Sequence, residues 1–116
     1  MNLRRGDVVR AQLDPTVGSE QAGERPAVVI SPSPVIEHSP VILIAPITSK
    51  KTERVFAFEA LIEPPEGGLT MRSKVMLTHL RSVDKRRIVY RYGSVGEATM
   101  KRLEEALRVA TGLTRF

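Results

Sequence analysis

The chain has 116 residues, of which 41% are hydrophobic and 27% charged, and a formal net charge of +5 at pH 7. This length suits one modest core, so we expect residues 1–116 to form a single domain. No apolar run approaches the ~18 residues of a membrane span, and the basic N-terminus lacks the apolar run of a signal peptide. The absence of cysteine excludes disulfides and thiolate metal sites. We therefore expect a cytoplasmic protein without membrane association.

The first half of the chain predicts three strands. Residues 6–13 (GDVVRAQL) alternate between polar and apolar, residues 26–31 (PAVVIS) suit a buried strand, and residues 41–49 (VILIAPITS) suit a central one. The twelve-residue loop 14–25 is rich in Pro, Gly, Ser and acidic residues, and loops of that length are often functional. Three prolines predict a turn or loop over residues 32–40. Pro46 should mark the end of its strand or a bulge, because proline lacks the ladder donor.

The second half predicts further strands and a closing helix. After a charged turn, an alternating strand carries Phe56 and Phe58 on one face, and residues 62–73 form another loop. Residues 74–83 (KVMLTHLRSV) and 88–93 (IVYRYG) predict two more strands around a turn at residues 84–87. Five to seven short strands favour a small antiparallel sheet that closes or nearly closes into a barrel. The fold class is therefore mainly β with a C-terminal helix.

The C-terminal helix carries clear boundary signals. Ser94 predicts its N-cap, and Glu97, three residues on, completes a capping box. An apolar stripe and a terminating glycine follow, at Met100, Leu103, Leu107 and Gly112.

The sequence lacks the residues that several kinds of catalytic or binding site require. His38 and His79 have no partner at metal-ligand spacing, so we expect no metal and no cofactor. No Gly-x-Ser-x-Gly nucleophile motif or phosphate-binding Gly-Lys-Ser/Thr occurs. The aromatic content is 4%, a poor supply for a base-stacking platform. One or two rings can still contribute, although core and edge positions are their more ordinary role; the candidates are Phe56, Phe58, Tyr90 and Tyr92.

The positive charge is concentrated between Arg72 and Arg91. This segment holds seven cations and one anion, Asp84, for a net charge of +6. Such a cluster suits a polyanion such as nucleic acid, and equally a solvated surface that promotes solubility. Composition alone does not separate the two.

Arg25 and Thr48 each stand at the end of an apolar strand. Taken alone, Arg25 is an ordinary surface charge near Glu20 or Glu24, and Thr48 an ordinary β-branched strand residue. Both positions also suit a polar side chain that a rigid scaffold presents at a groove.

Three blocks of the chain resemble the MazF/PemK toxins. RGDVVRAQLDPTVGSEQAGERPAVVIS (residues 5–31) resembles the family's N-terminal block, with its Gly-Asp-Val start and its loop ending in Glu-Gln-x-Gly-x-Arg-Pro. VILIAPITS (residues 41–49) resembles the second block, and residues 80–113 resemble the third. The blocks cover nearly the whole chain in the family's order. The resemblance implies a small SH3-like barrel, a homodimer, and a cognate MazE-like antitoxin that blocks the RNA groove.

The resemblance also implies an activity and its residues. It implies a sequence-specific, metal-independent endoribonuclease that cuts single-stranded RNA to a 2′,3′-cyclic phosphate and a 5′-hydroxyl. The catalytic arginine and threonine of the family fall on Arg25 and Thr48. Groove positions fall on Ser19, Glu20, Gln21 and Ser49. The groove-facing Thr78 and His79 replace the family's acidic residue and Gln, so a relative's cut site should not be transferred.

The chemistry is consistent with these residues. The 2′-hydroxyl of RNA is its own nucleophile, and a guanidinium can hold the phosphate with two charge-assisted hydrogen bonds. Glu20 or His79 can serve as the general base, although a non-catalytic histidine is the more ordinary role. Arg81 and Arg86 can follow the RNA backbone or attract an acidic antitoxin tail. The alternative function is a non-catalytic barrel, either a gyrase poison or an RNA-binding module.

Overall fold

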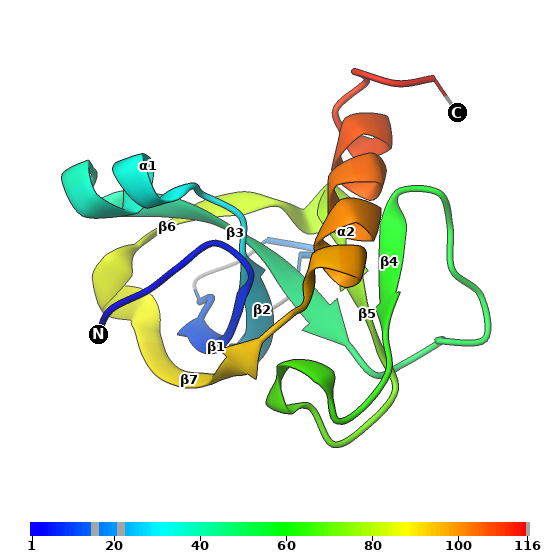
Figure 1. The fold of residues 1–116 in the computed structure, drawn as a ribbon, viewed down its shortest axis with the longest axis horizontal. Coiled ribbons are helices and arrows are strands. Elements are labelled where there is room, and N and C mark those ends of the chain that lie inside the picture. The colour runs from blue at the N-terminus through cyan, green and yellow to red at the C-terminus, as the bar shows by residue number, and fades with distance from the viewer. Residues whose placement is uncertain (15–16, 21–22, 116) are drawn as a thin grey trace.

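A computed structural model describes residues 1–14, 17–20 and 23–115. Across these residues an antiparallel sheet is accompanied by two helices and three 3₁₀ turns (Figure 1). The strands are β1 (Asp7–Gln12), β2 (Glu24–Val29), β3 (Val41–Thr48), β4 (Glu59–Ile62), β5 (Ser73–Met76), β6 (Arg81–Asp84) and β7 (Ile88–Ser94). The helices are α1 (Ser33–His38) and α2 (Glu97–Ala110), and the 3₁₀ turns are η1 (Glu66–Gly68), η2 (Leu77–His79) and η3 (Lys85–Arg87).

Strand β3 is the centre of the sheet. The strand order is β4-β5-β3-β2-β1-β7, and β6 also pairs with β3. The first half of β3 lies against β6 and its last two residues lie against β5. Within the described chain no ladder joins the outer strands β4 and β7, so the sheet is curved but open. The predicted mainly β fold with a C-terminal helix is confirmed, and the barrel is not closed.

Two apolar clusters hold the sheet. Val9 belongs to one, with Ile42, Ile44 and α1 residue Ile36, whereas its neighbour Val8 belongs to the other. Both valines are fully buried, because side chains of a strand alternate between its faces and β1 is covered on both. Complete burial of such an aliphatic side chain contributes about 1.5–3 kcal/mol. Helix α2 covers the second cluster beside β4, with Leu103 at its centre (Figure 1).

The start of α2 differs from the prediction. Ser94 is the last residue of β7 and not an N-cap, because the helix begins at Glu97 with Gly96 as its cap residue. The cap comes from a distant turn instead: Glu66 accepts hydrogen bonds from the Gly96 N–H at 2.9 Å and from the Thr99 hydroxyl at 2.8 Å. A residue about thirty positions away therefore does the work that the local capping box was expected to do.

The rest of α2 is as predicted. Leu103 is buried, and Met100 and Leu107 are partly buried against the same cluster. Gly112 has φ +79°, its N–H donates to the Val109 carbonyl, and the next N–H donates to Arg108. These two bonds form a Schellman motif, which is the glycine stop that the sequence indicated.

Four expectations about the chain between α1 and β7 were wrong or incomplete. Residues 33–38, expected as a loop, form α1, because Pro34 occupies its first turn, where a missing N–H costs nothing. Phe56 and Phe58 precede β4 instead of lying in it, although their rings do stack at 5.2 Å. The expected strand over residues 74–83 is divided by η2 into β5 and β6. Pro46 lies inside β3, at the point where the outer partner of β3 changes from β6 to β5.

Candidate active site

Arg25 and Thr48 line the same pocket. It has a volume of about 370 Å³ and opens at the ends of β2 and β3. The pairing of β2 with β3 runs from Val29 and Ile44 to Ala27 and Pro46, so Arg25 and Thr48 each lie two residues beyond its end, one on each strand. Two residues that are 23 positions apart in the sequence thereby line one pocket.

Local structure holds both residues in place. Pro26 follows Arg25, and its fixed φ angle stiffens the entry to the buried segment of β2. The Thr48 hydroxyl accepts a hydrogen bond from the Lys50 N–H at 3.1 Å, in the turn that ends β3. That bond uses the oxygen as an acceptor, so the hydroxyl proton can still be donated to a ligand. Ser49, a predicted groove residue, lines the same pocket and is exposed.

The opposite wall was not predicted from the sequence. It consists of the segment after η1, Ser73 of β5 and Tyr92 of β7. Gly68 has φ +74°, and a Cβ atom on it would lie 2.3 Å from the Tyr92 carbonyl oxygen, so only glycine fits there. The Gly67-Gly68 pair was a usable signal of this close approach between η1 and β7.

A second pocket has a volume of about 280 Å³. Pro46 lines it, whereas the next residue of β3, Ile47, lines the first pocket. The predicted RNA-contacting residues gather in this second pocket: Ser19, Glu20, Thr78, His79 and Arg81. Gln21 lies outside the described residues.

Hydrogen bonds order both walls of the second pocket. Glu20 accepts from the Val17 N–H at 2.8 Å, which folds the loop on itself. Arg81 donates to the Leu13 carbonyl at 3.0 Å and thereby joins β6 to the start of that loop. The η2 turn presents Thr78 and His79 to the pocket, because it interrupts the strand that the sequence predicted there.

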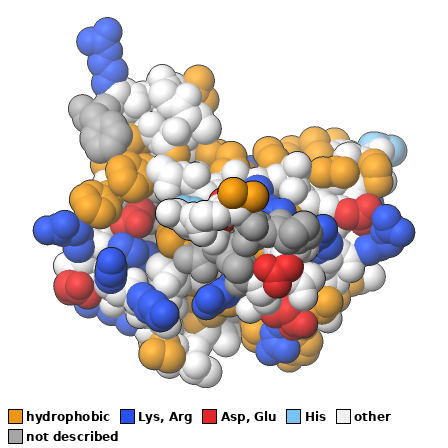
Figure 2. Space-filling model, turned by 180° about the vertical axis from the view of Figure 1, so that it is seen from behind, with side chains coloured by type: hydrophobic (Ala, Val, Ile, Leu, Met, Phe, Trp, Pro, Cys, Tyr) orange, Lys and Arg blue, Asp and Glu red, His pale blue; other side chains and the backbone are white. Residues whose placement is uncertain are grey.

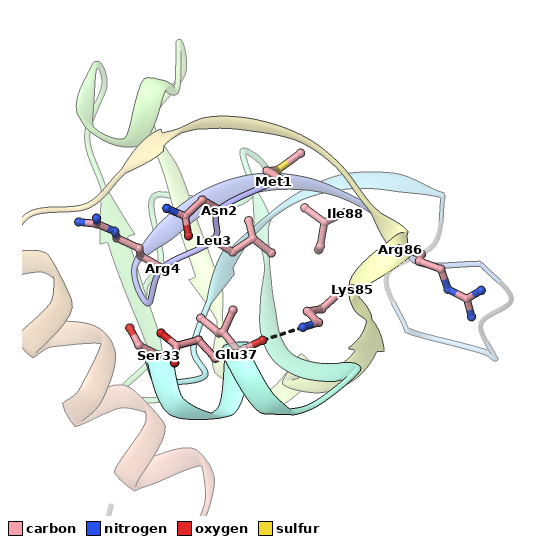
Figure 3. A pocket seen from close by; sticks show the side chains of 10 residues that line it. Met1, Asn2, Leu3, Arg4, Ser33, Glu37, Lys85, Arg86 and Ile88 are labelled. Carbon is pink, nitrogen blue, oxygen red and sulfur yellow. Dashed lines mark hydrogen bonds between the residues drawn. The ribbon is translucent and has the colours of Figure 1, made fainter.

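Arg86 is placed elsewhere. It lines a third pocket of about 900 Å³, together with the N-terminal segment and α1 (Figure 3). Figure 3 shows Arg86 pointing away from the other labelled side chains, while Lys85 donates to the Ile36 carbonyl at 2.7 Å. The Arg86 guanidinium and N–H donate to Asp84, and these bonds lower the pKa of that carboxyl to about 2. The structure does not bring Arg86 together with the other predicted site residues.

The basic segment is more compensated than its sequence suggests. Four of its cations pair with carboxylates within 3.4 Å: Arg72 with Glu63, Lys74 with Glu59, Arg86 with Asp84 and Arg91 with Asp7. Another three donate to backbone carbonyls: Arg81, Lys85 and Arg87. On the face seen in Figure 2, basic side chains are likewise interspersed with acidic ones. The segment therefore supplies only a few cations for a polyanion.

Within ranges 1–14, 17–20 and 23–115, no three His, Asp or Glu side chains come together as a metal site would require. Over the same part of the chain, neither helix has the length and hydrophobicity to cross a bilayer.

Comparisons with known proteins show a family and a shared fold. Residues 4–111 match the family described as PemK-like, MazF-like toxin of type II toxin-antitoxin system. Among solved structures, MazF from Deinococcus radiodurans matches with a TM-score of 0.80 and 26% identity, over 95% of this chain and 96% of that one. An endoribonuclease in complex with its cognate antitoxin, from Mycobacterial species, matches with a TM-score of 0.81 and 21% identity, over 99% and 100%. Mycobacterium tuberculosis toxin MazF-mt6 matches with 0.78 and 23%, over 94% and 99%.

Proposed function

Since this chain belongs to the family of PemK-like, MazF-like toxins of type II toxin-antitoxin systems, we propose that it is a sequence-specific, metal-independent endoribonuclease that cleaves single-stranded mRNA. The observation that carries the proposal is the shared pocket of Arg25 and Thr48. A guanidinium and a hydroxyl at one concave site are donors suited to a phosphodiester. The endoribonuclease from Mycobacterial species has the same fold.

The proposed reaction is an attack by the substrate's own 2′-hydroxyl. Its oxygen forms a bond to the adjacent phosphorus, and the bond from phosphorus to the 5′-oxygen breaks. The 2′-hydroxyl loses its proton to a base, and the leaving 5′-oxygen gains a proton. The products are a 2′,3′-cyclic phosphate and a 5′-hydroxyl.

Arg25 and Thr48 have distinct roles in this proposal. Arg25 stabilises the charge that develops on the phosphate oxygens, because its planar fork can donate two parallel hydrogen bonds. In this proposal Arg25 also helps to protonate the leaving 5′-oxygen. Thr48 holds a non-bridging oxygen or the 2′-hydroxyl, with the Lys50 N–H fixing the orientation of its side chain.

We assign the general base and the RNA-binding groove to the second pocket. Glu20 and His79 both line it and both are candidates for the general base. With Ser19, Thr78 and Arg81 they form a groove that reads the bases flanking the cut. Ser49 belongs to the catalytic pocket, and Gln21 completes the proposed set. Arg86 lines a different pocket, so we expect it to contribute less to RNA binding than the other proposed contacts.

The proposal extends to organisation and partners. Residues 1–116 act as one toxin domain, as a homodimer, in the cytoplasm where mRNA is found. A cognate MazE-like antitoxin binds the groove and blocks it. The antitoxin is supported by MazE-MazF of Deinococcus radiodurans, which matches this chain with a TM-score of 0.73 and 22% identity.

The test is cleavage of a long single-stranded RNA in the presence of EDTA. We expect the wild-type protein to cut it, and Arg25→Ala to lose at least about a hundredfold in rate. Arg108→Ala, an exposed arginine in the last turn of α2, is the matched control and should cut normally. No cleavage by the wild-type protein would contradict the proposal and favour a non-catalytic toxin or RNA-binding module on the same fold. Undiminished cleavage by Arg25→Ala would refute the mechanism.

A further inference from the structure

We propose that Tyr92 forms a stacking subsite for a nucleobase of the RNA, beside the phosphate to be cut, and that Arg10 is its positioning residue. The proposal rests on the proposed function, because it assumes that the pocket of Arg25 and Thr48 receives RNA. Tyr92 lines that pocket, with β7 on the side of β1 away from β2. In this proposal the ring stacks on a base attached to the ribose that reacts.

Tyr92 is the aromatic residue of the catalytic pocket, among the residues that the structure describes. Phe56 lines a different pocket, which contains neither Arg25 nor Thr48. Tyr92 is half-buried and packs against the second apolar cluster, while Gly68 lies against its backbone. The Tyr92 side chain is therefore held by the second apolar cluster and also contributes to the wall of the pocket.

Arg10 restrains the Tyr92 ring. Arg10 Nε donates a hydrogen bond to the Tyr92 hydroxyl at 2.8 Å, and the guanidinium carbon lies 5.6 Å from the ring centroid. The register places Arg10 opposite Tyr90 on β7 and opposite Pro26 on β2, next to Arg25. The hydrogen bond with Tyr92 also raises the pKa of Arg10, so its charge is constant over the working pH range.

Tyr90 supplies a second restraint. Its ring meets that of Tyr92 edge-on, with centroids 5.1 Å apart and an interplanar angle of 74°. A ring held by a hydrogen bond, a cation and a second ring has little freedom left to lose when a base stacks on it. Such stacking accepts any base, because every base has a π-face. The subsite therefore positions the strand, and the second pocket selects the sequence.

The chain provides its own reporter for this subsite. It has two tyrosines and no tryptophan, so its intrinsic fluorescence comes from Tyr90 and Tyr92. Tyr90→Phe leaves Tyr92 as the sole emitter while keeping a ring beside it. A nucleobase that stacks on Tyr92 should quench this emission.

The experiment has a binding arm and a kinetic arm. In the binding arm, uncleavable 2′-O-methyl oligonucleotides that tile the test RNA are titrated into Tyr90→Phe protein, with N-acetyl-tyrosinamide as the control for light absorption. We expect saturable quenching, and weaker quenching in Tyr90→Phe protein that also carries Arg10→Gln. In the kinetic arm, Tyr92→Leu should raise KM for RNA about 5- to 100-fold and leave kcat within about threefold, whereas Tyr92→Phe should raise KM less. Val89→Ala, an exposed neighbour on β7, is the control.

Two results would overturn the proposal. One is binding of the oligonucleotides, seen by anisotropy of a terminal dye, without quenching of Tyr92. The other is wild-type KM in Tyr92→Leu protein whose circular dichroism spectrum shows it to be folded. The quenching arm needs no change at Tyr92, so it decides the matter even if Tyr92→Leu fails to fold. If the wild-type protein cuts no RNA, the proposed function fails, and the quenching arm still decides whether a base stacks on Tyr92.

Discussion

The Arg81 guanidinium donates a hydrogen bond to the backbone carbonyl of Leu13 at 3.0 Å, across 68 positions of sequence. This contact joins β6 to the beginning of the loop that carries Ser19 and Glu20. Thr78 and His79, just before β6 in the chain, line the second pocket together with these loop residues. The two walls of the proposed recognition groove are thus coupled by one charged donor. Bonds of this kind, with one charged partner, contribute about 1.5–3 kcal/mol.

Arg81→Ala should loosen this groove. We expect about a tenfold loss in discrimination between the preferred cut site and near matches, because the loop is released from β6. The maximal rate at the preferred site should change little, since Arg25 and Thr48 line a different pocket from Arg81. The measurement is single-turnover cleavage of matched and mismatched RNA.

Arg86→Ala is the informative comparison for Arg81→Ala. Its side chain binds Asp84 and lines a different pocket, so RNA discrimination should change less than in Arg81→Ala. An equal loss in both variants would show that general positive charge, and not the tie to Leu13, sets discrimination. Loss of antitoxin binding in Arg86→Ala alone would assign that residue to the partner.

Thr48→Val should lower the cleavage rate by about 10²–10³, because the hydroxyl donor is lost while shape and β-branching are kept. Thr48→Ser retains the hydroxyl and should recover most of that rate. The measurement is the single-turnover rate constant at saturating RNA. Equal rates for the valine and serine variants would show that the hydroxyl takes no part in the reaction.

Glu66→Ala should destabilise the protein by about 1–2 kcal/mol, because it removes the acceptor for the Gly96 N–H at the start of α2. Glu97→Ala should cost less, since the cap that the sequence predicted for Glu97 is provided by Glu66. Urea unfolding followed by circular dichroism measures both. A larger loss of stability in Glu97→Ala than in Glu66→Ala would support the local capping box that the sequence predicted.

Asp84 makes a pH-dependent contribution to stability. Its folded-state pKa is lowered to about 2 from a model-peptide value of 3.8, chiefly by hydrogen bonds from Arg86. The stabilisation is therefore fully present above pH 3.8 and is lost as the pH falls from there towards 2. The unfolding free energies of wild type and Asp84→Asn should differ at pH 6 and converge towards pH 2. A difference that stays constant over this range would contradict the shift.

Much of the fold was predictable because local and global preferences agree. The strands β1, β2, β3 and β7 have alternating or β-branched apolar sequences, and α2 has its stripe and its terminating glycine. The pair Arg25 and Thr48 was predictable only through the resemblance of its blocks to a toxin family. Neither residue differs, by itself, from an ordinary surface arginine or strand threonine.

The sequence by itself determined most of the strand-forming segments and the apolar face of α2, because these depend on side-chain type and short-range spacing. Tertiary structure decided the rest. It divided residues 74–83 at η2, moved the cap of α2 to Glu66, paired several cations of the basic segment with carboxylates and brought Tyr92 to the pocket of Arg25 and Thr48. Several of these depend on partners far away in the chain, such as Asp7 for Arg91 or Gly68 for Tyr92. Only the pairing of strands brings such partners together, and a local sequence pattern carries no record of it.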